Sequence, residues 1–187
     1  MREGEAAVYA APAADGADRA WLAQLWRDGW GGDPMYSGGR VHHLARLEAF
    51  IAWEAGRRVG AATYAPPEDG VAELVSLDAL VPGRGVGSLL LQAVSDAVRA
   101  RGGRALKVVT TNDNLDALGF YQRRGFRLMA LRPGAVDVAR RHKPTIPLVG
   151  RHGIPVRDEL VLIAELAGEE PSSFPDSGGD DGAAPGS

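Results

Sequence analysis

Apolar residues recur with the period of a helix in two long segments of the chain. Residues 17–30 carry one stripe, at positions i, i+1, i+4 and i+5, formed by Trp21, Leu22, Leu25 and Trp26. Residues 87–101 carry a second stripe, formed by Leu90, Leu91, Val94, Ala97 and Val98. Both segments are predicted to be amphipathic helices, and Gly102-Gly103 would end the second. A shorter helix is predicted over 115–124, after the cap-type residues of the sequence NDN.

Shorter apolar or alternating segments predict strands. They cover residues 49–54, 59–64, 71–80, 105–111, 126–131 and 157–166, after a first short strand that ends near Tyr9. A short helix is expected over 41–47, and the Pro- and Gly-rich residues 132–156 are expected to form a long loop with one helical turn. The order of these elements predicts an α/β fold in which helices cover both faces of a central mixed sheet.

The composition is that of one globular domain, with 45% hydrophobic and 24% charged residues among 187. We expect this domain to cover residues 1–167. The segment 168–187 is expected to be a disordered acidic tail, because it holds five acidic residues, no Lys or Arg and few apolar side chains. Without the tail the net charge changes from −3 to +2, which argues against a nucleic-acid-binding or polybasic membrane surface.

The absence of cysteine excludes thiol catalysis, disulfides and thiolate-bound zinc. The four histidines lack the i, i+4 spacing of a helical zinc site, so no metal is expected. The first residues are acidic instead of basic, which predicts no signal peptide, and no apolar stretch approaches the roughly 20 residues of a membrane span. We therefore expect a cytoplasmic protein.

The sequence GRGVGS, residues 83–88, places three glycines between a predicted strand end and a predicted helix start. Such glycines either turn the chain sharply, or they let an anion approach the free main-chain N–H groups at the positive end of the helix dipole. Arg84 adds a cation, and a diphosphate would suit this site. No Gly-Lys-Ser/Thr follows, which excludes a P-loop, and the third glycine of the dinucleotide fingerprint is missing.

Residues 114–126, NLDALGFYQRRGF, resemble the closing motif of the GNAT superfamily of N-acetyltransferases. The acetyl-CoA signature of that family, Arg/Gln-x-x-Gly-x-Gly/Ala, aligns with PGRGVG at 82–87, where Gly85 and Gly87 match and Pro82 does not. Arg84 would supply the missing charge. The two motifs span about 71–131, and a looser resemblance covers about 5–167. The resemblance implies a bacterial acetyltransferase with acetyl-CoA as cofactor and a mostly antiparallel sheet of about seven strands.

The resemblance also implies catalytic roles. Tyr121 matches the general acid whose hydroxyl faces the CoA sulfur, although it would equally pack beside Phe120. Glu73 is the preferred general base for the amine, by analogy with carboxylates on the same strand in other members, while Asp78 and a water chain are alternatives. Strand alternation would place Glu73 on the face of Val75 and Leu77, and Asp78 on the opposite face or at a bulge.

Cofactor contacts are expected at three places. The main chain at the end of the strand would pair with pantetheine and support the oxyanion, the loop would bind the diphosphate, and Asn114 would bind the pantetheine arm or cap its helix. The full set of cofactor-binding candidates is Leu77, Asp78, Ala79, Gly83, Arg84, Gly85, Val86, Gly87, Ser88, Asn114 and Tyr121.

The acceptor lies outside both motifs. The basic segment 132–156, together with 30–43, is hypothesised to form a lid that would favour an acceptor bearing a carboxylate or phosphate. The resulting prediction is an N-acetyltransferase that moves an acetyl group to a primary amine, on a small molecule or a protein, by direct attack in a ternary complex. The alternative is an acyl-CoA-binding regulatory module that has lost transfer. Many members of the family are dimers, so a homodimer is an open alternative.

Overall fold

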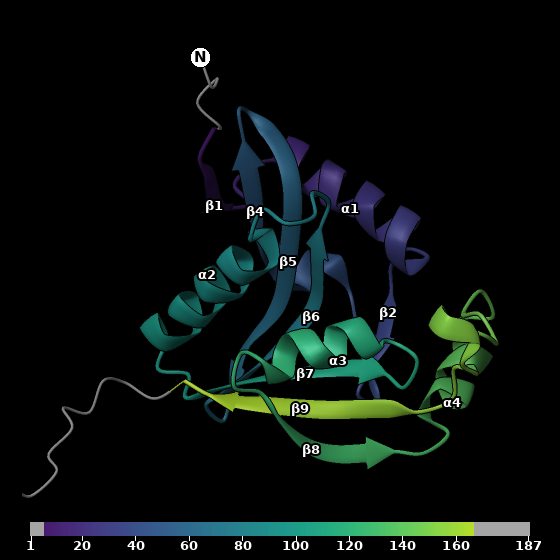
Figure 1. Cartoon of the computed structure of the whole chain (residues 1–187). Helices are drawn as coiled ribbons and strands as arrows, with labels where there is room; N and C mark the ends of the chain where they lie inside the picture. Colours follow the sequence, from purple (N-terminus) through teal and green to yellow (C-terminus); the bar gives the residue numbers. More distant parts are fainter. Residues whose placement is uncertain (1–5, 167–187) are drawn as a thin grey trace, which may run out of the picture.

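The computed structural model describes residues 6–166, and the tail predicted over 168–187 lies outside the described residues. Its centre is a seven-stranded sheet in the order β1-β4-β5-β6-β7-β9-β8 (Figure 1). All neighbouring strands are antiparallel except the parallel pair β6 and β7, which confirms the predicted mixed, mostly antiparallel sheet. The strands are β1 (Val8–Pro12), β4 (Glu48–Glu54), β5 (Arg57–Glu68), β6 (Val71–Ala79), β7 (Ala105–Thr111), β8 (Arg127–Arg132) and β9 (Glu159–Glu165).

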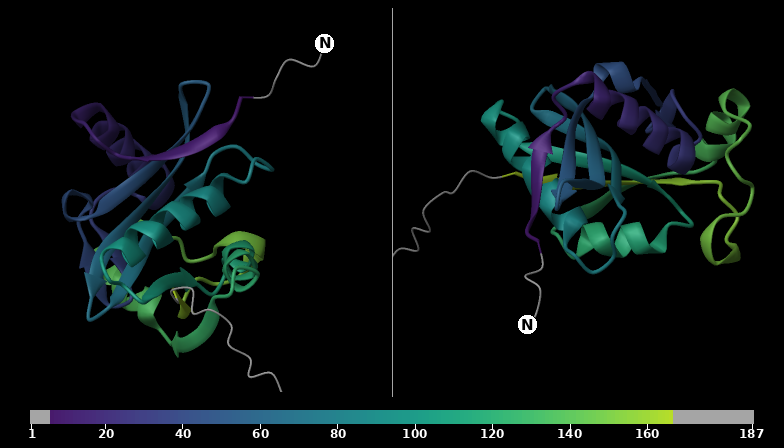
Figure 2. Two further views of the ribbon diagram at one scale, coloured as in Figure 1. Left: turned by 90° about the vertical axis from the view of Figure 1, so that its left-hand side faces the viewer. Right: turned by 90° about the horizontal axis from the view of Figure 1, so that it is seen from above.

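Helices cover both faces of the sheet, as predicted (Figure 2). Helix α1 (Gly16–Trp30) buries Leu22 and Trp26 on one face, and α2 (Val86–Ala100) buries the stripe around Leu90 and Val94 on the other. The short helix α3 (Leu115–Gln122) packs on the same face as α2. No helix within residues 6–166 is long and apolar enough to cross a membrane.

The helix expected over 41–47 is wrong. The chain forms a small hairpin there, β2 (Met35–Ser37) and β3 (Arg40–His42), followed by a single 3₁₀ turn, Leu44–Arg46. Gly38 and Gly39 connect the two strands with φ of +59° and +76°, the left-handed conformation that a two-residue hairpin turn requires. The glycine pair in YSGGR carries this signal in the sequence, whereas the apolar residues that follow it are typical of a helix.

The segment 132–156 contains more structure than the predicted loop with one helical turn. Helix α4 (Ala135–His142) occupies its first half and a 3₁₀ turn, Arg151–Gly153, its second. Helix α4 lies at the end of the sheet where β9 begins and β7 ends (Figure 1). This placement brings the segment beside the gap between β6 and β7.

Candidate active site

Strands β6 and β7 are paired only over their first halves. The parallel pairing runs from Val71 opposite Ala105 to Leu74 opposite Val108, and beyond it the strands separate. A cavity of about 840 Å³ fills this gap, within the size range of small-molecule sites. Strands β2, β6, β7 and β9, helix α3, the end of α1 and the 132–156 segment all line this cavity. The polar and aromatic residues that line it are Trp30, Tyr36, Ser37, Ser76, Asp78, Thr110, Thr111, Asp113, Asn114, Tyr121, Lys143, Thr145, Arg151 and Glu159.

A β-bulge in β6 changes which side chains face this cavity. Thr63 of β5 lies opposite Ser76 and Tyr64 lies opposite Leu74, so Val75 is the extra residue. Val75 packs in the core beneath α1, and the next residue, Ser76, also faces α1, where it accepts a hydrogen bond from Trp26 Nε1 at 3.2 Å. The alternation expected from the sequence is therefore wrong beyond this point.

The bulge puts Asp78 on the α1 face instead of the opposite one. Its two carboxylate oxygens accept the indole N–H of Trp30 at 3.0 and 3.1 Å. Burial raises the pKa of Asp78 to about 6, and the hydrogen bond from Trp30 only partly opposes this shift. A carboxylate with such a pKa is ionised at neutral pH and is still able to accept a proton.

The main chain of β6 also faces the gap. The N–H of Leu80 donates to the carbonyl of Val59 on β5 at 2.9 Å. Because N–H groups alternate in direction along a strand, those of Leu77 and Ala79 point to the other side, where β7 has moved away. This edge has the geometry expected for pairing with an extended ligand.

Tyr121 reaches the cavity from the α3 side. Its side chain is buried, it lines the cavity, and its ring packs against Phe120 and Phe126 with centroids 5.2 and 5.3 Å away. Burial, together with the negative charge of Asp78, raises the pKa of Tyr121, so the phenol O–H is retained at neutral pH. Both interpretations of Tyr121, packing and lining the site, are therefore compatible.

Asn114 caps its helix and also borders the cavity. It is the N-cap of α3, where its side-chain oxygen accepts the N–H of Ala117 at 3.3 Å, and it lines the cavity. A cap residue at this helix start faces the space in which a ligand would lie.

Glu73 occupies a different environment from the other predicted site residues. Its carboxylate is buried between His42 Nε2 at 3.3 Å and Lys107 Nζ at 2.8 Å, beneath the β2–β3 turn, and it is not among the residues that line the large cavity. Burial alone would raise the pKa of Glu73, but His42 and Lys107 hold it below its ordinary value. Its role as the base stays a prediction.

The glycine loop leads into α2 as predicted. Gly83 and Gly85 have φ of +72° and +71°, and a Cβ built on either would meet no atom within 4 Å. Gly85 is the N-cap residue of α2, and no side chain caps this helix start. Its first N–H groups are therefore accessible to an anion. Gly87 has a different reason to lack a side chain, because a Cβ there would lie 3.2 Å from the ring of Phe120.

Two arginines lie near this loop. Arg84 donates to the carboxylate of Glu54 and, at 3.1 Å, to the carbonyl of Ala6. Arg124 instead reaches the start of α2, where it donates to Ser88 Oγ at 2.6 Å and lies 3.6 Å from the centroid of the Phe120 ring. The sequence contains two adjacent arginines before Gly125, and nothing local distinguishes them.

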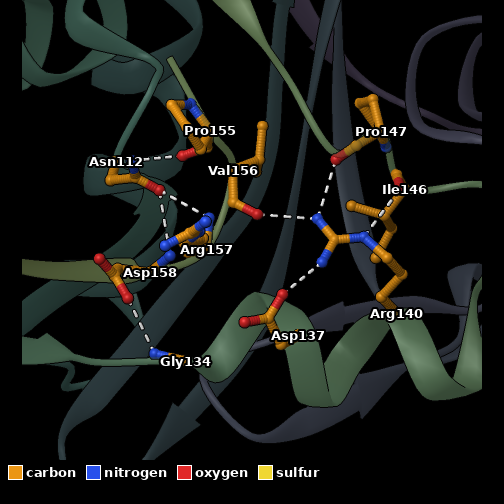
Figure 3. A network of polar contacts seen from close by, with 10 residues as sticks. All are labelled: Asn112, Gly134, Asp137, Arg140, Ile146, Pro147, Pro155, Val156, Arg157 and Asp158. Carbon is orange, nitrogen blue, oxygen red and sulfur yellow. Dashed lines mark hydrogen bonds and ion pairs between the residues drawn. The ribbon is translucent and has the colours of Figure 1, made fainter.

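The segment after β8 is held in place by a polar network (Figure 3). The guanidinium of Arg140 donates to the Asp137 carboxylate and to the carbonyls of Ile146, Pro147 and Val156, at 2.5–3.0 Å. Asn112 accepts the main-chain N–H groups of Arg157 and Asp158, both at 3.0 Å, and donates to the carbonyl of Pro155. These polar groups therefore fix one wall of the cavity.

Comparisons with known proteins agree on one family. The acetyltransferase (GNAT) family model matches residues 19–126. Uncharacterized protein YxbD of Bacillus subtilis (strain 168) is 40% identical over 146 residues, which cover 78% of this chain and 91% of that protein.

Solved structures share the fold at lower identity. The IAA acetyltransferase from Bacillus cereus ATCC 14579 has a TM-score of 0.64 and 20% identity, over 85% of this chain and 99% of that one. A GNAT family acetyltransferase from Elizabethkingia anophelis with acetyl-CoA bound has a TM-score of 0.65 and 19% identity, over 84% of this chain and 97% of that one. At these identities the two structures support the fold.

Proposed function

The chain belongs to the acetyltransferase (GNAT) family, and from that premise we propose that it moves an acetyl group from acetyl-CoA to a primary amine by direct attack in a ternary complex. One observation carries the proposal. The cavity between β6 and β7 is lined from both faces of the sheet, with Tyr121 on the α3 side and Asp78 on the α1 side. A donor and an acceptor are thus able to meet in the gap from opposite faces.

The chain's own residues fit acetyl-CoA. The uncapped start of α2 with the open positions Gly83 and Gly85 suits a diphosphate, and Arg124 adds a positive charge within reach of it. The N–H of Ala79 suits an amide of pantetheine, which leaves the N–H of Leu77 for the thioester carbonyl, and Asn114 borders the same space. A GNAT acetyltransferase with acetyl-CoA bound shares this fold, which supports the assignment.

The acceptor amine must lose a proton before it attacks. An ordinary alkylamine with a pKa of about 10.4 is neutral in only about one molecule in 2,500 at pH 7. We assign the base to Asp78, because its carboxylate lines the cavity on the acceptor side and burial raises its pKa to about 6. Glu73 remains the alternative, acting from beneath the hairpin through water.

The acetyl thioester supplies the electrophilic carbonyl and a thiolate leaving group. The N–H of Leu77, which borders the cavity, would stabilise the oxyanion that forms when the amine attacks. The O–H of Tyr121 donates to the departing sulfur, and the raised pKa of this phenol keeps the proton available across the neutral range. Tyr121 therefore acts at the sulfur and Asp78 at the nitrogen.

The test is thiol release from acetyl-CoA across a panel of primary amines at pH 7 and pH 8. We expect release with at least one class of amine and its loss in Asp78→Asn. Glu73→Gln distinguishes the two candidate bases, since it leaves the groups that line the cavity intact. Binding of CoA without thiol release from any amine contradicts the proposal and favours a regulatory CoA-binding module.

A further inference from the structure

Three carboxylates line the cavity, and two of them have ordinary partners. Asp78 accepts the indole N–H of Trp30. Asp113 is buried, and its two oxygens accept the hydroxyl of Thr111 at 2.5 Å and the main-chain N–H of Arg151 at 3.0 Å. Neither needs a further group to satisfy its oxygens, so neither indicates a missing ligand.

Glu159, the third carboxylate, has within the described part of the chain a hydrogen-bond donor for only one of its two oxygens. Its side chain is 7% exposed, and Oε1 accepts the N–H of Gly38 at 3.3 Å. Among residues 6–166 no group donates a hydrogen bond to Oε2, and the Nε of Arg132 lies 3.5 Å from it. Burial raises the pKa of Glu159, the contacts with Gly38 and Arg132 only partly oppose this shift, and the charge of Glu73 adds to it. A cation that entered the cavity would stabilise this carboxylate.

Two cationic side chains line the cavity, and neither pairs with Glu159. Lys143 donates to the carbonyls of Trp30, Gly32 and Pro34 at 2.7–3.1 Å, which uses its three N–H groups on the negative end of α1. Arg151 is mostly exposed and pairs with Asp116 at 3.3 Å. Arg140, in the same segment, is bound to Asp137 and to main-chain carbonyls. Lys143 and Arg140 are thus bound to the chain itself, and neither offers the cavity a cation for an anionic acceptor.

Two aromatic side chains line the same cavity as Glu159. Tyr36 and Trp30 both line the cavity, and Tyr36 and Ser37 precede Gly38, whose N–H contacts Glu159. Aromatic faces in a cavity that also holds a buried carboxylate suit an ammonium group. Resting on the amine transfer proposed above, we propose that Glu159 binds a second, protonated amine of the acceptor, which makes the acceptor a diamine or a longer polyamine.

The experiment compares acceptors that share one reacting amine and differ in the charge at the other end. The six-carbon set is 1,6-diaminohexane, 1-aminohexane and 6-aminohexanoate. The four-carbon set is 1,4-diaminobutane, 1-aminobutane and 4-aminobutanoate. Wild-type protein should show kcat/KM for the better diamine about tenfold or more above the matched monoamine, the scale of one charge-assisted hydrogen bond. The amino acid should be the poorest acceptor. Equal values for the diamine and the monoamine in both sets overturn the proposal.

Two variants test whether Glu159 causes the preference for the diamine. Glu159→Gln keeps an acceptor for the Gly38 N–H and should raise KM for the diamine to that of the monoamine, with kcat little changed. Glu165→Gln is the matched control, because Glu165 is exposed at the far end of β9, and it should keep the preference. A preference unchanged in Glu159→Gln, or a fall in kcat for every amine, contradicts the role. If Glu159→Gln does not fold, Glu159→Asp, which withdraws the charge by one methylene, should shift the preference toward the longer diamine.

A direct binding measurement separates this inference from the transfer reaction. If wild-type protein releases no thiol with any amine, the proposed function fails, and calorimetric titration of CoA-saturated protein with 1,6-diaminohexane and 1-aminohexane still tests Glu159. Tighter binding of the diamine that is lost in Glu159→Gln supports the cation site. Equal binding of the two amines overturns it.

Discussion

Replacement of Gly85 by alanine tests whether the glycine loop binds an anion at the start of α2 or only allows the chain to turn. Gly85 precedes α2 and Gly102 follows it, and their φ angles are nearly the same, +71° and +75°. A Cβ at either position meets no atom within 4 Å. Alanine in the left-handed region costs about 1–2 kcal/mol. Gly85→Ala and Gly102→Ala should therefore lower stability by similar amounts.

Only Gly85 lies where an anion would approach the free N–H groups of the helix start. A methyl group there stands between the main chain and the diphosphate. Loss of one charge-assisted hydrogen bond, worth about 1.5–3 kcal/mol, would raise the dissociation constant for CoA by roughly 10- to 150-fold. Gly102→Ala, at the negative end of the same helix, should leave the CoA dissociation constant unchanged.

The assay is calorimetric titration of each variant with CoA, combined with thermal denaturation. Turnover of S-acetylpantetheine, which lacks the diphosphate, is a second control, and Gly85→Ala should impair it no more than Gly102→Ala does. Equal losses of CoA affinity in both variants would show that strain alone is responsible. An unchanged affinity in Gly85→Ala would show that the glycines only turn the chain.

Four further substitutions test the remaining roles. Tyr121→Phe should lower kcat by about 10²-fold, the scale of a lost general acid, without changing CoA affinity in a titration. Asp78→Asn should abolish the rise of kcat/KM with pH through about 6, whereas Glu73→Gln should keep it; the opposite result assigns the base to Glu73. The pKa of Asp78 in the folded protein, about 6, lies above its ordinary 3.8, so the contribution of Asp78 to folding stability is fully present below pH 3.8 and is lost as the pH rises through about 6. Asp78→Asn should therefore raise the melting temperature at pH 8. Arg124→Gln should raise the CoA dissociation constant about tenfold, and Arg123→Gln, the adjacent control, should not.

The parts of the fold that were predictable have local causes. The helical stripes of α1 and α2 and the apolar run of β7 appear in the structure within one or two residues of the predicted bounds. Each is specified by a repeat over consecutive residues, and the buried side of each follows from that repeat. The glycine loop was predictable for the same reason, since it lies between a strand and a helix that the pattern defines.

The parts that were missed depend on contacts between distant residues. Arg84 lies within the glycine loop and Arg124 lies far from it in the sequence. Only the fold shows that Glu54 binds the first and that the second reaches Ser88. Helix α4 is short, and the carbonyls that bind Arg140 come from as far away as Val156. No local pattern records such partners.

The bulge at Val75 has the largest consequence for the site, because one inserted residue decides which carboxylate faces the acceptor. Regular alternation would place Asp78 on the side of α2; the bulge turns it toward Trp30, on the side where Gly38 holds Glu159. The cavity is therefore acidic on the α1 side, while the α2 side offers a helix start and Arg124. Such a separation suits an anionic cofactor that enters from one face and a cationic amine that enters from the other. Both proposals place the amine on the α1 side, and the extra residue at Val75 is what turns Asp78 to that side.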